Sequence, residues 1–480
     1  MTDRFRSIRA GRPGSLALEV VAWIAILALA AILRLPDLAA RGSWDADQGH
    51  DMLVLRHLVV DGTIPLLGPP TSIGDFHHGV LYYALLAPPA FLSGADPVAV
   101  TTWIAVGGIL AVATTGWLAR SIAGPWAGVV AGLLMAVSAS AVGESIVIWN
   151  PNVIALSSSI ALAAAWRGHV TGRTAWWAVA GAAAVVTMQC HVLGVILTPV
   201  IAGLLVADGR SGRRVGRAAI AWIAIAAVSY LPLAIHELGN DASELRGAIA
   251  FLAGGGGSSD ISLPIRLVVT FVRVLSWPLT GLLSDAPVAA LLAAGLVVAI
   301  VAWRGWLDAG AEGIERTAVR WLGLGLAWTV VALAIAAPSL ATIVPGLPND
   351  HYHAFADPMV VALVGIGAAA AFRQRAVVAR AATTVAVAGI AAFNLVTQPP
   401  AVAPDGGWRA ARSAAERTAE AVDTAPFALV SLPEFKSDEA LRMPLEAIGR
   451  RPVAGQPTAS ATVVVMCDQR FHEAIGAACG

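Results

Sequence analysis

Three aspartates lie within a seven-residue stretch soon after the first long apolar segment of the chain, and a histidine pair follows. The aspartates are Asp45, Asp47 and Asp51, and the pair is His77 with His78. Carboxylates act as general bases or bind hard cations, and the Asp-x-Asp spacing allows both uses. Asp45 and Asp47 are therefore either a metal site or one base with one orienting group. A single aspartate there would usually be a solvated flank, but this group favours a functional site.

Other polar residues stand between apolar segments and complete the set of candidate substrate-binding residues. These are His50, Arg56, Glu144, Asn150, Asn152, His191, His351 and His353. Polar side chains at membrane depth are costly and are usually retained for function. A histidine at a span end can also be a plain structural residue, which is the alternative for His191, His351 and His353.

The composition shows what must position these residues. The chain has 480 residues, of which 57% are hydrophobic and only 13% are charged, with a mean hydropathy of +0.73. Soluble proteins carry about 25% charged residues, so this chain needs a lipid-facing surface. The formal net charge is zero. These values exclude a cytosolic enzyme, a disordered chain and a nucleic-acid-binding protein.

Apolar segments of about 20 residues predict membrane-spanning helices. We expect about eleven spans: 15–34, 98–119, 125–142, 153–167, 174–190, 191–207, 218–236, 286–303, 319–337, 353–372 and 377–396. The first is expected to be retained as a span, because it lacks a convincing cleavage site. Two further segments, 79–93 and 263–283, contain prolines or arginines and are expected to lie in the interface.

The positions of the arginines set the predicted direction of the chain. Short cytoplasmic loops collect Lys and Arg, and eleven spans put every arginine cluster on one side. The clusters are Arg4 to Arg12, Arg167 with Arg173, Arg210 to Arg217, Arg304 to Arg320, and Arg373 to Arg380. We therefore predict a multi-pass plasma-membrane protein with a cytoplasmic N-terminus and an extracytoplasmic C-terminus.

The loop 35–97 is then the catalytic first outer loop of a transmembrane domain that covers 1–397. Within it, residues 50–60 are predicted to form an amphipathic helix with Met52, Leu55 and Val59 on one face, and residues 79–92 a second interfacial helix. The other polar candidates fall on the same predicted face. Their convergence indicates an active site at the outer membrane surface.

The tail, 398–480, changes character and predicts a small α/β domain. Helices are expected at 406–423 and 437–450, and strands at 427–432 and 461–467, the latter buried. On the outer side Cys467 and Cys479 would meet an oxidising compartment, where a disulfide between them is expected. The domain either covers the site, binds the acceptor or serves as a stabilising cap.

At these motifs the chain resembles the GT-C membrane glycosyltransferases, in the branch of protein mannosyltransferases and lipid A aminoarabinose transferases (glycosyltransferase family 39-like). Residues 47–51 occupy the place of the family's acidic motif, and His77 to Tyr82 that of its Lys-Pro-Pro-Leu-x-Tyr-like stretch. The polar stretch 144–152 matches a later loop, and 351–358 is similar to an Arg-Tyr-x-x-x-x-x-Pro pattern. Gln48 replaces the second acid, and His50 and His77 stand where relatives often have Arg or Lys.

This resemblance implies a GT-C-like, all-α polytopic membrane protein that transfers a sugar from a polyprenyl-phosphate donor to a glycan, lipid or protein acceptor on the outer face. Asp47 is the first choice for the general base and Asp45 the second. His50, Arg56, His77 and His78 are the candidates for the leaving phosphate, and Asp51 and the remaining polar residues for substrate binding. A single attack predicts inversion. The resemblance fixes no cofactor, and a divalent metal ion, with Asp45 and Asp47 as ligands or beside the histidines, stays an open alternative.

Two other functions fit parts of the sequence. A transporter or lipid-linked-glycan flippase would place polar sites near the bilayer midplane, often in repeats. A ligase or polymerase would use diphosphate-linked donors and outer-loop arginines, and Arg246, Arg266 and Arg273 fall on the predicted outer side. Loss of glycan transfer in an Asp47→Asn variant would separate the transferase from the transporter.

Overall fold

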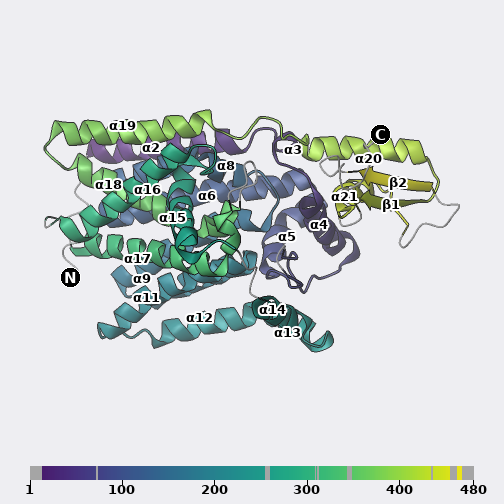
Figure 1. Ribbon diagram of the computed structural model, residues 1–480, viewed down its shortest axis with the longest axis horizontal. Helices are drawn as coiled ribbons and strands as arrows, with labels where there is room; N and C mark the ends of the chain where they lie inside the picture. Colours follow the sequence, from purple (N-terminus) through teal and green to yellow (C-terminus); the bar gives the residue numbers. More distant parts are fainter. Residues whose placement is uncertain are drawn as a thin grey trace.

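The computed structural model describes residues 13–71, 74–254, 260–308, 310, 313–342, 349–433, 436–453 and 462–467. It confirms the predicted fold class: a bundle of apolar helices with a small α/β unit at one end (Figure 1). Each of the eleven predicted spans has a helix. They are α2 (Pro13–Arg34), α6 (Pro97–Ala123), α7 (Pro125–Val137), α9 (Ile154–Thr171), α10 (Thr174–Cys190), α11 (Leu197–Arg210), the bent pair α12 (Gly216–Ser229) and α13 (Leu231–Gly239), α16 (Pro287–Ala302), α17 (Gly313–Ala336), α18 (Asp357–Phe372) and α19 (Val377–Val396).

The remaining helices are shorter or lie at the ends of the bundle. They are α3 (Leu38–Arg41), α4 (Ala46–Arg56), α5 (Leu81–Ser93), α8 (Ala139–Glu144), α14 (Ser243–Ala253) and α15 (Leu263–Thr280). Short π and 3₁₀ turns extend or connect them: η1 (His57–Asp61), η2 (Asn150–Val153), η3 (Val192–Ile196), η4 (Trp303–Leu307), η5 (Pro338–Ala341) and η6 (Asp350–Ala356). The two predicted interfacial helices of the first loop thus correspond to α4, continued by η1, and to α5.

Nine helical segments of the described chain are long and apolar enough to cross a membrane, or ten with the bent pair, and α15 is one of them. The interfacial position predicted for 263–283 therefore stays a prediction, but the contacts of α15 show where its C-terminal half lies. Arg273 donates to the carbonyls of Leu340 (2.7 Å) and Thr342 (3.2 Å), and Asn394 donates to Leu279 O (2.7 Å). These partners lie at the ends of α17 and α19 that face the α/β unit. The C-terminal half of α15 therefore stays at one end of the bundle.

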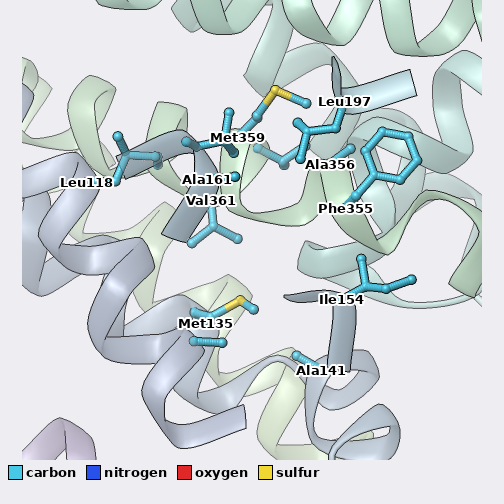
Figure 2. Packing of buried hydrophobic residues seen from close by; sticks show 14 of the residues in the cluster. Leu118, Met135, Ala141, Ile154, Ala161, Leu197, Phe355, Ala356, Met359 and Val361 are labelled. Atoms are coloured by element: carbon cyan, nitrogen blue, oxygen red, sulfur yellow. The ribbon is translucent and has the colours of Figure 1, made fainter. Parts of the chain in front are cut away.

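Helix α18 is the centre of the bundle. Small and branched apolar residues along its whole length are buried, whereas most of α19 and α2 is exposed and available to lipid. Figure 2 shows Met359 and Val361 of α18 among Leu118 of α6, Met135 of α7 and Ala161 of α9. This packing replaces water with apolar contacts on every side of one helix and supplies the rigid frame for the site.

Several spans end abruptly at the end of the bundle that carries the α/β unit, and polar side chains pair with the backbone groups freed there. Asn394 accepts from Ala139 N (2.8 Å), and Gln398 donates to Val137 O (2.7 Å). Without water, an unpaired backbone group at membrane depth costs several kcal/mol. These side-chain amides therefore lower the energetic cost of the break between α7 and α8.

Arg34, the last residue of α2, also pairs with backbone groups at the break between α7 and α8. It is fully buried, and its guanidinium donates to Ala136 O (2.8 Å), Met135 O (3.1 Å) and Ser145 Oγ (3.3 Å). The planar fork of donors suits such a cluster of acceptors better than any other side chain. A charged residue inside the bundle is thus explained by backbone carbonyls.

Four of the predicted arginine clusters gather at the other end of the bundle, and the fifth, Arg4 to Arg12, lies outside the described residues. Arg373 pairs with Glu315 (2.7 Å) and donates to Ala123 O, while Arg213 pairs with Asp208. The structure therefore separates an arginine-rich end from the end with the α/β unit, as the eleven-span prediction requires. Which end faces the cytoplasm stays a prediction.

The C-terminal unit contains α20 (Gly407–Val422), β1 (Phe427–Leu432), α21 (Glu439–Ala447) and β2 (Thr462–Cys467). The two strands pair in parallel, with Phe427 opposite Thr462, which confirms the predicted order of elements. The expectation that β2 is buried is wrong: its side chains are exposed or half-buried, and β1 is its one strand partner among the described residues. Cys467 ends β2, and Cys479 lies outside the described residues, so the disulfide stays a prediction.

Replacing Arg34 with methionine tests the role of the buried guanidinium. Arg34→Met keeps the length of the side chain but leaves two carbonyls at the α7–α8 break unpaired. We expect a loss of about 2 kcal/mol in stability, measured by thermal unfolding in detergent. Arg375→Met, at an exposed arginine, is the control and should leave the unfolding temperature unchanged. Equal changes of the unfolding temperature in the two variants would contradict the role of the Arg34 guanidinium at this break.

Candidate functional site

A cavity of about 360 Å³ opens at the end of the bundle beside the α/β unit. Its wall combines the first loop, the ends of four spans and the C-terminal unit. Seven predicted site residues line it: Asp47, His50, Asp51, His78, Asn150, His191 and His351. Six do not: Asp45, Arg56, His77, Glu144, Asn152 and His353. The tertiary structure thus brings together residues from five separate parts of the sequence.

The start of α4 is held by a capping box, which separates the roles of the two aspartates. Asp45 is the N-cap: its carboxylate accepts from Ala46 N (2.9 Å), and Gln48 Oε1 accepts from Asp45 N (2.9 Å). Such reciprocal bonds satisfy the free N–H groups of the first turn. Gln48 also donates to Ile148 O (2.9 Å). The residue that replaces the family's second acid therefore has a structural role here.

Asp47, in the first turn of α4, points a solvent-exposed carboxylate into the cavity. The surrounding protein removes part of its hydration, and the nearby Asp45 carboxylate repels its charge, so the pKa of Asp47 is raised above its usual range. The positive charge of Lys436, the only lysine in the chain, partly offsets this and lowers the pKa of Asp47. Asp47 is accessible and has the raised basicity that a general base needs.

Asp51 lies one turn further along the same helix face and is almost fully buried. Its carboxylate accepts from Tyr82 Oη (2.7 Å) and Tyr83 Oη (2.9 Å) of α5. Burial raises the pKa of Asp51 to about 7, although both phenols stabilise the ionised form. The tyrosines thus connect the two interfacial helices and hold a titratable carboxyl at the cavity wall.

The C-terminal unit contributes Ser437 and Glu439 to the cavity, and sequence reasoning missed both. Glu439 Oε1 lies 2.9 Å from His50 Nδ1. The hydrogen bond with Glu439 raises the pKa of His50. Burial alone would raise the pKa of Glu439, but its interactions with His50, Ser437 and Arg442 together outweigh burial and lower the pKa. Nothing in the local sequence marks Glu439, because its function depends on where α21 docks.

Aromatic rings form the opposite wall. His191 lies with its ring centroid 5.0 Å from that of His78 and 5.9 Å from that of His351, and Trp149 packs on His351 at 4.2 Å. Burial lowers the pKa of His78 to about 4 and the pKa of His191 well below its usual range. Both imidazoles are therefore neutral near neutral pH and offer hydrogen bonds instead of positive charge.

The ring nitrogens of these two histidines also have defined roles. Nδ1 of His78 accepts from Val192 N, and Nδ1 of His191 accepts from Leu193 N, both at 3.3 Å. A neutral imidazole that accepts at Nδ1 carries its proton at Nε2. Both rings are therefore neutral donors that the backbone of η3 orients.

The predicted residues outside the cavity have structural partners. Asn152 donates to Val147 O (2.7 Å), Arg56 donates to Glu446 O (2.9 Å), and His77 pairs with Glu244 of α14 (3.0 Å). Asn150, although at the wall, donates its amide to Cys190 O (2.5 Å). Each of these side chains joins two segments of the chain near the site.

A second polar network lies behind the wall and contains two of the predicted site residues, Glu144 and His353. Asp350 is buried between Arg273 (2.5 Å) and His353 (2.9 Å). Glu144 accepts from Trp277 Nε1 (3.3 Å), and its complete burial raises its pKa. The geometry makes His353 and Arg273 partners of Asp350, which fixes η6 against α15.

Within the described residues, no three or more His, Cys, Asp or Glu side chains are grouped so that they could hold a metal ion. The divalent ion at Asp45 and Asp47 therefore stays a prediction, and the capping role of Asp45 gives an alternative reason for its presence.

No protein-family model matches the chain, and no curated protein is significantly similar to it in sequence. Solved structures are similar to it. ArnT from Cupriavidus metallidurans bound to undecaprenyl phosphate has a TM-score of 0.62 at 12% identity, over 97% of this chain and 95% of that one. ArnT in the apo state has a TM-score of 0.59 at 14% identity, over 92% and 86%. The predicted GT-C-like fold is thus confirmed.

Removing one phenol from Asp51 tests the tyrosine pair. Tyr82→Phe should raise the pKa of Asp51 above about 7. An acid whose folded pKa exceeds its unfolded pKa destabilises the fold once pH rises above the unfolded value. The variant should therefore lose about 1–2 kcal/mol of stability above neutral pH and less in acid. Unfolding would be measured across pH, with Asp51→Asn as background; the same pH-dependent loss in that background would contradict the explanation.

Proposed function

We propose that this chain is an integral membrane glycosyltransferase that transfers a hexosyl or pentosyl unit from a polyprenyl-phosphate donor to a glycan, lipid or protein acceptor at the outer face of the plasma membrane. The observation that carries the proposal is the cavity at one end of the bundle, with the exposed carboxylate of Asp47 at its wall. The fold shared with ArnT, which was solved bound to undecaprenyl phosphate, supports it.

The cavity has the size and lining that a sugar requires. About 360 Å³ lies within the usual range of small-molecule sites, about 300–1,000 Å³. Trp149 and Tyr352 supply apolar ring faces, while Asp47 and the neutral histidines supply acceptors and donors for hydroxyl groups. A polyprenyl chain would lie outside the cavity along the exposed apolar faces of the helices, so that only the sugar and the phosphate enter.

The reaction is a single displacement. The acceptor hydroxyl oxygen bonds to the anomeric carbon while the bond from that carbon to the phosphate oxygen breaks and its electron pair stays on the phosphate. Asp47 takes the hydroxyl proton, which its raised pKa favours. Attack opposite the leaving group inverts the anomeric centre. Asp51, beside Asp47, holds the first turns of α4 in place through α5.

The paired variants Asp47→Asn and Asp45→Asn test the base. Both replace a carboxylate by an amide, but asparagine is an equally good N-cap, so Asp45→Asn preserves the capping box. We expect Asp47→Asn to lower transfer by about 100-fold or more and Asp45→Asn to retain it. The assay follows labelled sugar from a polyprenyl-phosphate donor into envelope lipids, glycans or proteins of membranes that contain the chain.

Mass spectrometry of these products would identify acceptor and anomeric configuration. Equal loss in both variants would overturn the assignment of Asp47 as the base. Absence of any transfer by the wild-type chain, with movement of lipid-linked glycan across vesicles instead, would overturn the transferase and favour a flippase.

A further inference from the structure

The cavity presents a problem of charge. Phosphate gains negative charge as it leaves, and enzymes place positive groups where that charge develops. Yet none of the described residues that line the cavity is an arginine or a lysine. His78 and His191 are held neutral, as shown above. His50 of α4 is a lining histidine that is paired with a carboxylate, that of Glu439.

The pair of His50 and Glu439 has the geometry of an oriented imidazole. Glu439 Oε1 lies 2.9 Å from His50 Nδ1, and Ser437 Oγ donates to the other oxygen, Oε2, at 2.7 Å. A carboxylate at Nδ1 fixes the proton there and sets the ring plane. This leaves Nε2 of His50 as the ring nitrogen available to the cavity.

The position of Glu439 depends on close contact between α21 and α4. Trp44 Nε1 donates to Ala440 O (2.8 Å). Gly49 faces the backbone of α21, and a Cβ at this residue would come within 2.3 Å of Glu439 O. The contact therefore requires glycine next to His50. It fixes the register that brings Glu439 to the imidazole.

We propose that Glu439, supplied by the C-terminal unit, is a positioning residue that keeps His50 doubly protonated, with its Nε2–H directed at the phosphate of the lipid donor. This inference rests on the proposed function. The C-terminal unit thereby completes the donor site instead of serving only as a cap. In the displacement, His50 stabilises the phosphate that keeps the electron pair of the broken bond, while Asp47 receives the acceptor proton.

The charges around His50 favour its protonated form. Asp47 and Asp51 on α4 and Glu439 on α21 all favour the cation. Two cations lie near these carboxyl groups. Lys436, which precedes α21, lowers the pKa of Asp47, and Arg442, on the next turn of α21, lowers the pKa of Glu439. Three carboxyl groups thus surround one imidazole, and the hydrogen bond with Glu439 is the largest influence on its pKa.

The chain contains a matched control. His57 and Glu446 repeat the pair seven residues further along both helices, with His57 Nε2 3.5 Å from Glu446 Oε2, away from the cavity lining. Both glutamates therefore connect α21 to a histidine, His50 of α4 or His57 of η1, but of the two only Glu439 lines the cavity. Glu439→Gln and Glu446→Gln should weaken docking of α21 similarly and differ in their effect on the site.

The experiment compares the pH dependence of transfer in the wild-type chain, Glu439→Gln and Glu446→Gln. Activity that needs protonated His50 falls as pH rises through its pKa, and loss of Glu439 lowers that pKa. We expect the alkaline limb of Glu439→Gln to move to lower pH, with about a tenfold loss near pH 8 and little loss near pH 6. Glu446→Gln should keep the wild-type limb.

A charge-retaining variant completes the test. His50→Lys carries an ammonium that stays protonated over this range, so its activity should not show the alkaline limb of the wild type, and adding Glu439→Gln should change it little. An unshifted limb in Glu439→Gln, or equal shifts in both glutamine variants, would overturn this inference alone if Asp47→Asn still abolishes transfer. A wild-type chain without transfer would overturn the proposed function as well.

Discussion

The structure depends on one constraint: backbone groups that a broken helix frees at membrane depth must find protein partners. The breaks near Ser138 and His191 lie at the end of the bundle that carries the site. At the break near Ser138, Arg34 and Asn394 form hydrogen bonds with the free backbone groups. At the break near His191, Asn150 donates to Cys190 O. Because these side chains satisfy the backbone, the helices can stop short and leave room for a polar cavity.

This constraint also sorts the polar residues of that end. Asn152 and Arg56 hold backbone carbonyls, and Asp350 is enclosed by Arg273 and His353. Such residues build the frame of the site and do not face it. The groups left to face the cavity include Asp47 and His50, whose side chains keep access to solvent. Exposure at the wall, combined with a raised pKa, therefore separates candidates for chemistry from residues that support the fold.

The cavity is assembled across the whole chain. Helix α4 supplies the acid and one imidazole, the ends of the spans supply rings, and α21 supplies Glu439. Figure 1 shows α4 and α5 at the end of the bundle, next to α20 and α21. The contact between Gly49 and the backbone of α21 is what permits this approach. A site built in this way couples the position of the C-terminal unit to the charge inside the cavity.

The sequence alone determined the membrane class, the eleven apolar segments, the α/β tail and the cluster of candidate site residues around Asp47. These follow from local hydropathy and from residue types within a few positions of each other. It ranked Asp47 before Asp45 as the candidate base but did not reveal that Asp45 caps α4, since a cap and a general base use the same side chain. It also marked Asn152 and His353 as site residues, because polarity at membrane depth looks the same whether a side chain binds substrate or a carbonyl. Only the tertiary structure decided that Glu439, almost 400 residues from the first loop, stands at His50, because a pairing of this kind depends on helix docking and leaves no periodic trace in the sequence.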